Sequence, residues 1–466
     1  MLSAYRVDQI RAAEETAARV HGWDGLMQAA ARALADEVAL RVPSDATVLV
    51  LTGPGNNGGD ALFAAARLSE RGHRVDIALL DTATAHAEGL AAAQGAGARF
   101  VDEPTDQRYV VDGIFGIGAR AGLEGRAAQW AAWAHREHPF VIAVDAPSGI
   151  GVDDGTVPGP AITADVTVTF GAAKPGLLIG RGGLATGEII VHGVGIAEHL
   201  DDPACATVEL GDGALFQGLI PGAESQKYGR GVLGIHAGSP EYAGAAHLCV
   251  AGAQAGTAGM VRFVGARELC DRVVDRAPEV VTGRGRVQAW VVGPGGIDDP
   301  EPVRQALADE VPVLIDATAL SHLPDRLRPE VLLTPHAGEL ARLLDVDRSE
   351  VEADPWSHAL RAAEHWNATV LLKGPRTLVV DPSGRTFVNT SGTPWLATAG
   401  AGDVLAGFAG SLLASGLTPL EAGALAALLH GTAAEREART GPFPAHRVAG
   451  RLPAVLGDFL APAAAR

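Results

Sequence analysis

The chain has 466 residues, of which 47% are hydrophobic and 20% are charged, so it has the composition of a folded protein with room for two or three domains. Its formal net charge of −18 argues against binding to the phosphate backbone of nucleic acids and to anionic membrane surfaces. Small phosphorylated ligands are not excluded, because local dipoles hold them whatever the net charge.

No targeting segment, membrane span or cysteine motif is indicated by the sequence. Residues 1–15 are rich in charged side chains and lack an apolar run, so we expect no signal peptide. The uncharged stretch 242–261 is mostly alanine and glycine, which favours a tightly packed buried helix over a membrane span. Cys205, Cys249 and Cys270 are far apart, so we expect reduced thiols in a cytoplasmic protein.

Short apolar strands alternate with alanine-rich helical segments along the whole chain. This alternation is typical of a mainly parallel sheet with helices on both faces. It breaks once, where strand-like residues 188–191 lead into the polar segment 199–203 and a new strand is predicted at 207–210. We therefore expect a domain boundary near residues 200–210.

The first half contains a glycine-rich segment after its first predicted buried strand, residues 47–51. The segment 52–60 includes Asn-Asn-Gly-Gly-Asp at 56–60 and precedes a helix predicted from about residue 61 to 70. It matches neither the dinucleotide-binding fingerprint nor a P-loop. Its glycines permit close approach of the backbone to a ligand, and a plain tight turn with Asp60 as a helix cap is the alternative.

Two later strands of the first half also end in polar side chains. Asp112 follows one of them, and Asp145 and Ser148 follow the other. Each aspartate alone is consistent with a cap or turn, but the carboxyl ends of parallel strands meet at one edge of a sheet, so we expect these residues to converge with Asn57. Their oxygens suit an alkali or alkaline-earth cation. Lys174 either holds an anionic group or is a solvated loop lysine.

The second half repeats this pattern of polar groups at strand ends. His336 lies between proline and alanine in a loop with glycine close by, which favours a ligand contact over a core position. Lys227-Tyr-Gly-Arg-Gly231 either meets a polyphosphate or is solvated. The predicted strands and the segments that follow them are 232–236, 290–292 with Gly-Pro-Gly-Gly at 293–296, 313–315 with Asp316, 331–333 with the loop 334–339, and 370–372 with the loop 373–377.

The segment Thr-Ala-Gly-Ala-Gly-Asp-Val at 398–404 opens the apolar helix-like run 405–414. Backbone N–H groups and the helix dipole at such a start attract an anion. Asp403, fixed beside that anion, is suited to accept the proton of a hydroxyl group while a phosphoryl group arrives. The alternative is an ordinary helix start with Asp403 as a capping acid.

The order of the Lys-Gly loop at 373–374, the segment 389–394 and the Gly-Ala-Gly-Asp turn at 400–403 resembles the ribokinase-like superfamily. In that superfamily the aspartate is the base and the preceding glycines form the anion hole. A ribokinase-like small-molecule kinase fused to a Rossmann-like binding domain is therefore one alternative function.

The two halves together resemble a more specific family. The motifs at 56–60, 112–118 and 145–149 are similar to those of the NAD(P)H-hydrate epimerase domain. The motifs at 227–231, 293–296, 333–339 and 400–403 are similar to those of ADP-dependent NAD(P)H-hydrate dehydratase. Nearly the whole chain resembles the bifunctional NAD(P)H-hydrate repair enzymes that carry both domains, with the epimerase first.

This resemblance implies an α/β fold with two domains. Residues 1–205 would form an N-terminal Rossmann-like, three-layer αβα epimerase domain, and residues 206–466 a C-terminal ribokinase-like α/β dehydratase domain. The first would interconvert the R and S hydrates of NADH and NADPH (NADHX and NADPHX). The second would dehydrate the S form with ADP, giving NAD(P)H, AMP and phosphate. The partners expected are these small molecules, with no nucleic acid and no membrane, in a homo-oligomer.

The resemblance also implies functional residues. Asp403 and Asp145 would be catalytic, and Mg²⁺ would accompany ADP. The potassium ligands would be Asn57, Asp112 and Ser148. The epimerase would bind its hydrate through Asn56, Asn57, Gly58, Gly59, Asp60, Gly116, Ile117, Gly118, Ala119, Arg120, Ala121, Gly122 and Asp145. The dehydratase would bind its hydrate through Ala246, Gly296, His336 and Asp403, and ADP or AMP through Lys373, Gly374, Pro375, Arg376, Thr377 and Gly402.

The chain departs from the family pattern at a few positions, none of which removes a group assigned to chemistry. Ala61 stands where glycine is usual and is expected to narrow the epimerase pocket slightly. Gln226 replaces a common histidine, Ala401 a common serine or threonine, and Ala-Thr-Ala at 317–319 a segment that commonly holds a second acid. A non-enzymatic scaffold is the remaining alternative, which the retained catalytic aspartates disfavour.

Overall fold

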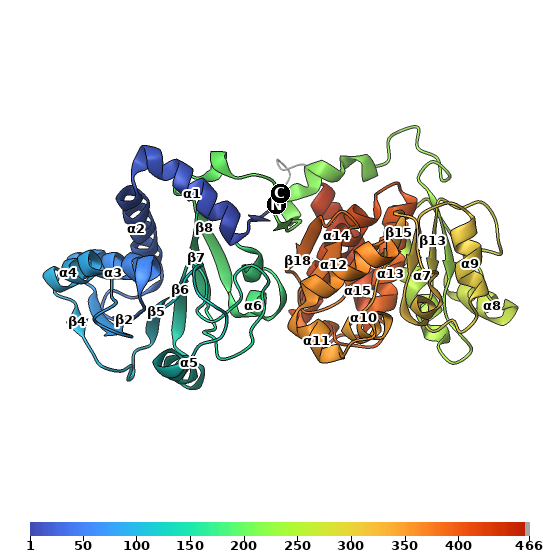
Figure 1. Cartoon of the computed structure of the whole chain (residues 1–466). Coiled ribbons are helices and arrows are strands. Elements are labelled where there is room, and N and C mark those ends of the chain that lie inside the picture. The colour runs from blue at the N-terminus through green and yellow to red at the C-terminus, as the bar shows by residue number, and fades with distance from the viewer. Residues whose placement is uncertain (462–466) are drawn as a thin grey trace. The chain divides into compact units, whose positions relative to one another are not determined.

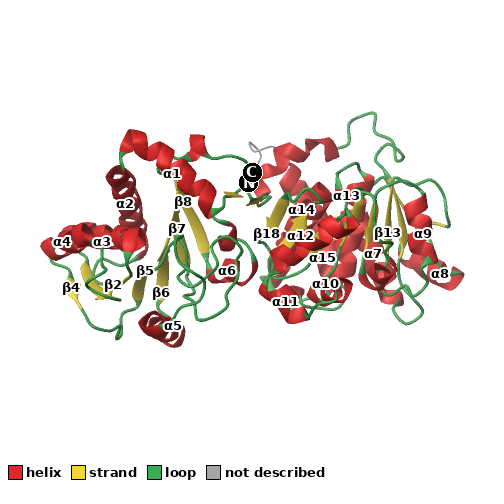
Figure 2. Cartoon of the chain, viewed as in Figure 1, coloured by secondary structure: helices red, strands yellow, loops and turns green. Residues whose placement is uncertain are grey.

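The computed structural model describes residues 1–461 and divides the chain into two compact α/β units (Figures 1 and 2). The N-terminal unit spans Ser3–Cys205, and the C-terminal unit comprises Ala206–Arg466 with Met1–Leu2. Residues 462–466, the end of the predicted second domain, lie outside the described part of the chain. The predicted α/β fold class is confirmed.

The N-terminal unit is built on a seven-stranded sheet in the order β4-β3-β2-β5-β6-β7-β8, with every neighbouring pair parallel. The strands of the unit are β1 (Ser3–Ala4), β2 (Thr47–Thr52), β3 (Arg74–Leu79), β4 (Arg99–Phe100), β5 (Tyr109–Gly113), β6 (Phe140–Val144), β7 (Val166–Phe170) and β8 (Glu188–His192). Its helices are α1 (Val7–His21), α2 (Trp23–Arg41), α3 (Gly55–Glu70), α4 (Ala87–Gly95), α5 (Gly125–Glu137) and α6 (Gly180–Ala185), with short 3₁₀ turns at Pro175–Leu177 and Ala197–His199.

The strands of this sheet are buried on both faces. In β2, Val48 and Val50 belong to an apolar cluster with residues of α2 and α3, whereas Leu49 and Leu51 belong to a second cluster with residues of α5. Because successive side chains of a strand point to opposite faces, helices cover both sides of the sheet (Figure 1). This is the three-layer arrangement predicted for the first domain.

The C-terminal unit has a larger mixed sheet that contains the strand order β18-β17-β16-β15-β14-β13-β10-β11-β12, with β12 at its edge. Strands from β16 to β12 pair in parallel, and β17 and β18 continue antiparallel. The strands are β10 (Val232–His236), β11 (Met260–Phe263), β12 (Val281–Thr282), β13 (Ala289–Val292), β14 (Val313–Ile315), β15 (Val331–Leu333), β16 (Thr369–Leu372), β17 (Thr377–Val380) and β18 (Thr386–Asn389).

Helices and 3₁₀ turns complete this unit. The helices are α7 (Ala243–Gln254), α8 (Arg267–Arg276), α9 (Glu301–Ala308), α10 (Ala337–Leu344), α11 (Arg348–Ala353), α12 (Pro355–Trp366), α13 (Ala401–Ala414), α14 (Pro419–Ala438) and α15 (Ala445–Leu460), and the 3₁₀ turns are η3 (Leu210–Leu219), η4 (Ala317–His322) and η5 (Pro394–Leu396). The strand predicted at 207–210 is wrong. The short strand β9 is Cys205–Ala206, and Glu209 N–H donates to Asp212 Oδ2 at 2.8 Å, which starts η3 instead.

The stretch 242–261 contains the buried helix α7 and not a membrane span. A Cβ atom on Gly252 of α7 would lie 2.1 Å from the Val404 carbonyl oxygen, and one on Gly407 would lie 1.9 Å from the Cys249 carbonyl oxygen. The backbones of α7 and α13 therefore touch through glycines on both helices. Among the helices of residues 1–461, none has both the length and the apolar character needed to cross a bilayer.

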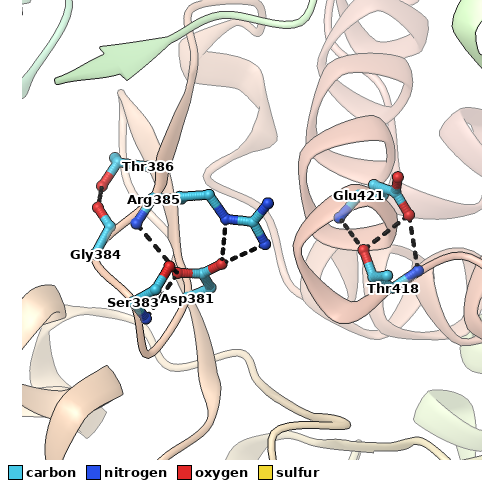
Figure 3. Close-up of polar contacts among 7 residues, drawn as sticks. All are labelled: Asp381, Ser383, Gly384, Arg385, Thr386, Thr418 and Glu421. Atoms are coloured by element: carbon cyan, nitrogen blue, oxygen red, sulfur yellow. Dashed lines mark hydrogen bonds and ion pairs between the residues drawn. The ribbon is translucent and has the colours of Figure 1, made fainter. Parts of the chain in front are cut away.

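Local polar contacts fix the turns of the C-terminal unit (Figure 3). Between β17 and β18, Asp381 Oδ1 accepts hydrogen bonds from the Ser383 N–H at 2.9 Å and the Arg385 N–H at 3.1 Å. Arg385 Nε donates to Asp381 Oδ2 at 2.8 Å. At the start of α14, Thr418 and Glu421 form a reciprocal capping box. Both motifs satisfy backbone groups that the turns leave unpaired.

Candidate functional site

The order of the parallel strands reverses at β2 in the N-terminal unit and at β10 in the C-terminal unit. In the N-terminal unit β2 lies between β3 and β5, and in the C-terminal unit β10 lies between β11 and β13. Ligands of open α/β sheets bind at such switch points, outside the carboxyl ends of the strands. The loops after β2 and β10 are therefore the places where each unit is expected to hold a ligand.

The motif at 56–60 is helical, which corrects the predicted boundary. Helix α3 begins at Gly55, so Asn56–Asp60 form its first turns and not a loop before it. A Cβ atom on Gly58 would lie 2.0 Å from the Gly53 carbonyl oxygen, and one on Gly59 would lie 3.0 Å from the ring of His86. These glycines permit tight packing, and the free N–H groups of the first helical turn are available to an anion.

A cavity of about 1060 Å³ opens at this helix start. Most of the predicted hydrate-binding residues line it, namely Asn56, Asn57, Asp60, Gly116, Ile117, Gly118, Ala119, Arg120, Ala121, Gly122 and Asp145. Gly58 and Gly59 are buried and are not part of the lining. Ala61 is also fully buried, and a Cβ atom on Gly113 would lie 2.4 Å from its methyl group. The Ala61 side chain therefore does not narrow the cavity as expected.

The cavity also contains residues that the sequence did not single out. Arg11 and Glu14 come from α1, Trp23 from the start of α2, and His86 from the turn before α4. His86 Nδ1 accepts a hydrogen bond from the Gly89 N–H at 3.1 Å, so its ring caps α4. No sequence motif surrounds Glu14. Its position in a charged amphipathic helix indicates only that the side chain is exposed, and not that it lines a cavity.

Two carboxyl groups of the cavity favour their protonated forms. Burial, and then the nearby Asp145 and Glu14, raise the pKa of Asp60 well above its ordinary value. Burial and Asp145 also raise the pKa of Glu14, against lowering by Lys174 and Arg11. Asp60 Oδ1 is buried without a hydrogen-bond partner among residues 1–461. The site therefore combines Asp60, whose pKa is raised, with Asp145, which forms an ion pair with Lys174.

Asp112 and Ser148 meet behind this cavity, as predicted from the strand ends. The Ser148 hydroxyl donates to Asp112 Oδ1 at 2.7 Å, and the Ser148 N–H donates to Asp112 Oδ2 at 2.8 Å. Burial raises the pKa of Asp112 to about 6, although hydrogen bonds from Ser148 and Ile114 favour the ionised form. Asp112 is fully buried and has no ion-pair partner within the described residues. Such a carboxylate fits a cation-binding position.

Asn57, the third predicted ligand of that cation, lies at the start of α3. Its Nδ2 is buried without a hydrogen-bond partner among residues 1–461, and a Cβ atom on Gly116 would lie 2.7 Å from its Oδ1. Amide, carboxylate and hydroxyl oxygens are ligands that alkali cations accept. Within residues 1–461, no three His, Cys, Asp or Glu side chains converge as a metal site.

Lys174 is not solvated, so that interpretation of the sequence is wrong; the anionic group that it holds is the Asp145 carboxylate. Its side chain is only 1% exposed, and it forms an ion pair with Asp145. The reason is its place after β7, where Thr169 and Phe170 supply further acceptors. By contrast, Lys227 and Arg230 are exposed, and the Lys227 ammonium lies 5.1 Å from the ring of Tyr228.

In the C-terminal unit the Gly-Ala-Gly-Asp segment forms the start of α13. Gly400 has a φ of 88° and is the residue before the helix, which begins at Ala401. Asp403 thus lies in the first turn, without a side-chain capping bond. Burial and the neighbouring Asp316 raise the pKa of Asp403 to about 6, against lowering by Lys373. His430 of α14 is buried, and this burial lowers its pKa to about 4.

An ion cluster adjoins Asp403. Lys373 Nζ lies 2.7 Å from Asp316 Oδ1 and 3.8 Å from Glu339 Oε2. Burial lowers the pKa of Lys373, but Asp316, Glu339 and Asp403 outweigh it and raise this pKa above its ordinary value. The His336 N–H donates to Glu339 Oε2 at 2.8 Å, and the His336 side chain is 53% exposed. The predicted residues Lys373, His336 and Asp403 therefore lie in one continuous network.

The other predicted residues of this unit occupy different places. Gly402 adjoins the network, because a Cβ atom there would lie 3.6 Å from Lys373 Nζ. A Cβ atom on Gly296 would lie 3.9 Å from Tyr242, an exposed residue that the sequence did not indicate. Ala246 is fully buried in α7 and exposes no side chain to a ligand. Gly374, Pro375, Arg376 and Thr377 lie at the turn from β16 to β17, where the Thr377 hydroxyl donates to the Gly374 carbonyl at 3.1 Å.

The chain matches known proteins along most of its length. A family model described as YjeF-related protein N-terminus matches residues 24–176, and one described as NAD(P)H-hydrate dehydratase matches residues 233–449. A bifunctional NAD(P)H-hydrate repair enzyme of Mycobacterium tuberculosis is 39% identical over 410 residues, covering 83% of each chain. An NAD(P)H-hydrate epimerase of Microbacterium testaceum is 45% identical over 212 residues, covering 43% of this chain and 81% of that protein.

The solved structures add information on the fold of the C-terminal unit. A ribokinase-like superfamily protein of Enterococcus faecalis superposes with a TM-score of 0.50 at 21% identity, covering 56% of this chain and 99% of that one. At this identity the likeness concerns the fold alone.

Proposed function

The chain belongs to the family of bifunctional NAD(P)H-hydrate repair enzymes, and on that premise we propose that it repairs hydrated nicotinamide nucleotides in two steps. Residues 1–205 interconvert the R and S hydrates of NADH and NADPH. Residues 206–466 dehydrate the S form with ADP, giving NAD(P)H, AMP and phosphate. The observation that carries the proposal is that each unit has acidic side chains beside a helix start at the carboxyl ends of its parallel strands. These are Asp60 and Asp145 at the start of α3, and Asp403 and Asp316 at the start of α13.

The dehydratase step begins with Asp403. Its carboxylate takes the proton of the hydrate hydroxyl, whose oxygen attacks the β-phosphorus of ADP while the bond to the AMP oxygen breaks. Lys373 and the N–H groups at the start of α13 stabilise the charge on the phosphoryl oxygens. Phosphate is then expelled by the lone pair of the ring nitrogen, and loss of a proton from the neighbouring carbon restores the ring double bond.

The predicted contact residues of the C-terminal unit are divided between the nucleotide and the hydrate. We assign Lys373, Gly374, Pro375, Arg376, Thr377 and Gly402 to ADP or AMP. We assign Ala246, Gly296, His336 and Asp403 to the hydrate, with Ala246 acting through the position of its backbone because its side chain is buried. Mg²⁺ enters as part of the ADP substrate complex.

The epimerase step needs one protonated and one ionised group. The bond between the ring carbon and the hydroxyl oxygen breaks as the ring nitrogen forms a double bond to that carbon, and the leaving oxygen takes a proton to become water. Water then adds to the opposite face and loses a proton. Asp60 is suited to give the first proton and Asp145 to accept the second. K⁺ at Asn57, Asp112 and Ser148 would neutralise a buried negative charge and hold the cavity loops.

Incubation of the protein with racemic NADH hydrate and ADP tests this proposal. Complete recovery of the absorbance of the reduced ring is expected, with AMP and phosphate formed in equal amounts. Phosphorylation of a small alcohol, with no recovery of the ring, would support the ribokinase-like kinase instead. Binding of ADP without turnover would support a scaffold. We further propose a cytoplasmic location and a homo-oligomeric state, which fractionation and light scattering test.

A further inference from the structure

Lys174 is one of the largest fully buried side chains of the described chain. Its ammonium donates to Asp145 Oδ1, to the Thr169 hydroxyl oxygen at 2.7 Å and to the Phe170 carbonyl oxygen at 3.2 Å. An ammonium group has three N–H donors and no acceptor, so these three hydrogen bonds use all of its donors. The lysine is therefore fixed in a single orientation at the end of β7.

The two oxygens of Asp145 have different surroundings. Oδ1 accepts from Lys174, from the Thr169 hydroxyl at 3.1 Å and from the Phe170 N–H at 3.3 Å. Oδ2 has no hydrogen bond from any residue in the range 1–461. The Asp145 side chain is 12% exposed against 1% for Lys174, and Asp145 lines the cavity. The lysine thus lies behind the carboxylate, and Oδ2 is the oxygen that is free to meet a ligand.

We propose that Lys174 is a positioning residue for epimerisation, which anchors Asp145 through Oδ1 so that Oδ2 faces the cavity as a proton acceptor. This inference rests on the proposed epimerase function of the N-terminal unit. The backbone of Asp145 supports it, because its φ of 66° is a left-handed conformation that non-glycine residues seldom adopt. Strain of this kind persists where the surrounding contacts hold it in place.

The charge of Lys174 has a second effect on the cavity. The charged groups that face Asp145, apart from Lys174, are Asp60 from α3 and Glu14 from α1, with Arg11 of α1 beside Glu14. Both Asp60 and Glu14 are acids, and Lys174 is the cation paired with the Asp145 carboxylate. Removal of the ammonium leaves a buried carboxylate without a cation.

The test uses the full chain, pure R hydrate and excess ADP, so that epimerisation limits the recovery of the reduced ring. Lys174→Gln keeps hydrogen-bonding groups and removes the charge, whereas Lys174→Arg keeps the charge. We expect Lys174→Gln to lower the rate at neutral pH by about 10²-fold or more, because a positioned base contributes about 10²–10⁴-fold. We also expect the epimerisation rate of Lys174→Gln to rise at a higher pH than that of the wild-type protein. The rate of Lys174→Arg should rise at the wild-type pH.

Two controls separate this role from a loss of folding or of the proposed function. Turnover of pure S hydrate reports the C-terminal unit in the same samples and must stay at the wild-type rate at every pH. Arg99→Gln removes the exposed cation of another ion pair in the same unit, that of Arg99 with the buried Asp76, and must leave the R-hydrate rate and its pH profile unchanged. A wild-type protein that cannot use R hydrate would refute the epimerase function itself.

Several results would overturn the inference while leaving the epimerase function intact. One is a Lys174→Gln variant with the wild-type rate. Another is a variant whose rate falls equally at every pH, as expected of a purely structural lysine. If Lys174→Gln fails to fold, Lys174→Arg is the deciding variant. A rate that rises at the same pH as in the wild-type protein supports the proposal, and a rate that rises at a different pH overturns it.

Discussion

Replacement of Asp403 by asparagine should abolish dehydration and leave ADP binding nearly intact. Asparagine keeps the shape of the side chain at the start of α13 but cannot accept the hydroxyl proton, so kcat should fall by about 10²–10⁴-fold. The pKa of Asp403 is raised to about 6 by burial and by Asp316, and the base works only when ionised. The wild-type rate on S hydrate should therefore rise with pH and flatten above 6; it should be about tenfold lower at pH 5 than at pH 7.

The assay is recovery of the reduced-ring absorbance from pure S hydrate across this pH range, with ADP affinity measured by calorimetry. The residual rate of Asp403→Asn should not depend on pH in this window. Asp381→Asn is the matched control, because Asp381 holds the β17–β18 turn through Arg385 and takes no part in the site (Figure 3). It should lower stability without changing the rate. Wild-type turnover by Asp403→Asn would refute the assignment of the base.

Two further predictions concern the cation and the packing of helices. Asp112→Asn should remove most of the epimerase rate and leave the S-hydrate rate unchanged. K⁺ should raise the melting temperature of the wild-type N-terminal unit but not that of the variant. An equal rise in both melting temperatures would place the cation elsewhere. Gly407→Ala should lower the free energy of unfolding by about 1–3 kcal/mol or more, because its Cβ would lie 1.9 Å from the Cys249 carbonyl. Gly450→Ala in α15, with nothing within 4 Å, should raise it by about 0.5–1 kcal/mol; denaturation curves that do not separate these two variants would contradict the packing argument.

The buried strands were predictable because their apolar runs end in polar or glycine residues. The strands predicted at 232–236, 313–315 and 331–333 have the observed bounds. Convergence of Asp112 and Ser148 followed from the parallel sheet alone. Glycine-rich helix starts were not predictable in the same way. Gly58 is needed because a side chain there would collide with the Gly53 backbone, and not because the chain turns at this residue. Composition cannot distinguish these two uses of glycine.

The environment of charged side chains was the least predictable feature. Lys174 has the sequence context of a loop lysine, and only the end of β7, a strand that the sequence did not indicate, surrounds it with acceptors. Glu14 reaches the cavity because α1 lies against it, which is a tertiary arrangement without a local pattern. Side chains whose role depends on another element of the fold leave no signal at their own position.

The division of labour between the two units is tested most directly by Asp145→Ala in the full chain, given racemic NADH hydrate and ADP. The wild-type protein should restore the whole absorbance of the reduced ring. The variant should consume the S form at the wild-type rate and then stop near half of that absorbance, apart from slow spontaneous epimerisation. Addition of the intact N-terminal unit, residues 1–205, should release the plateau. A variant that consumes both epimers at the full rate would contradict the account.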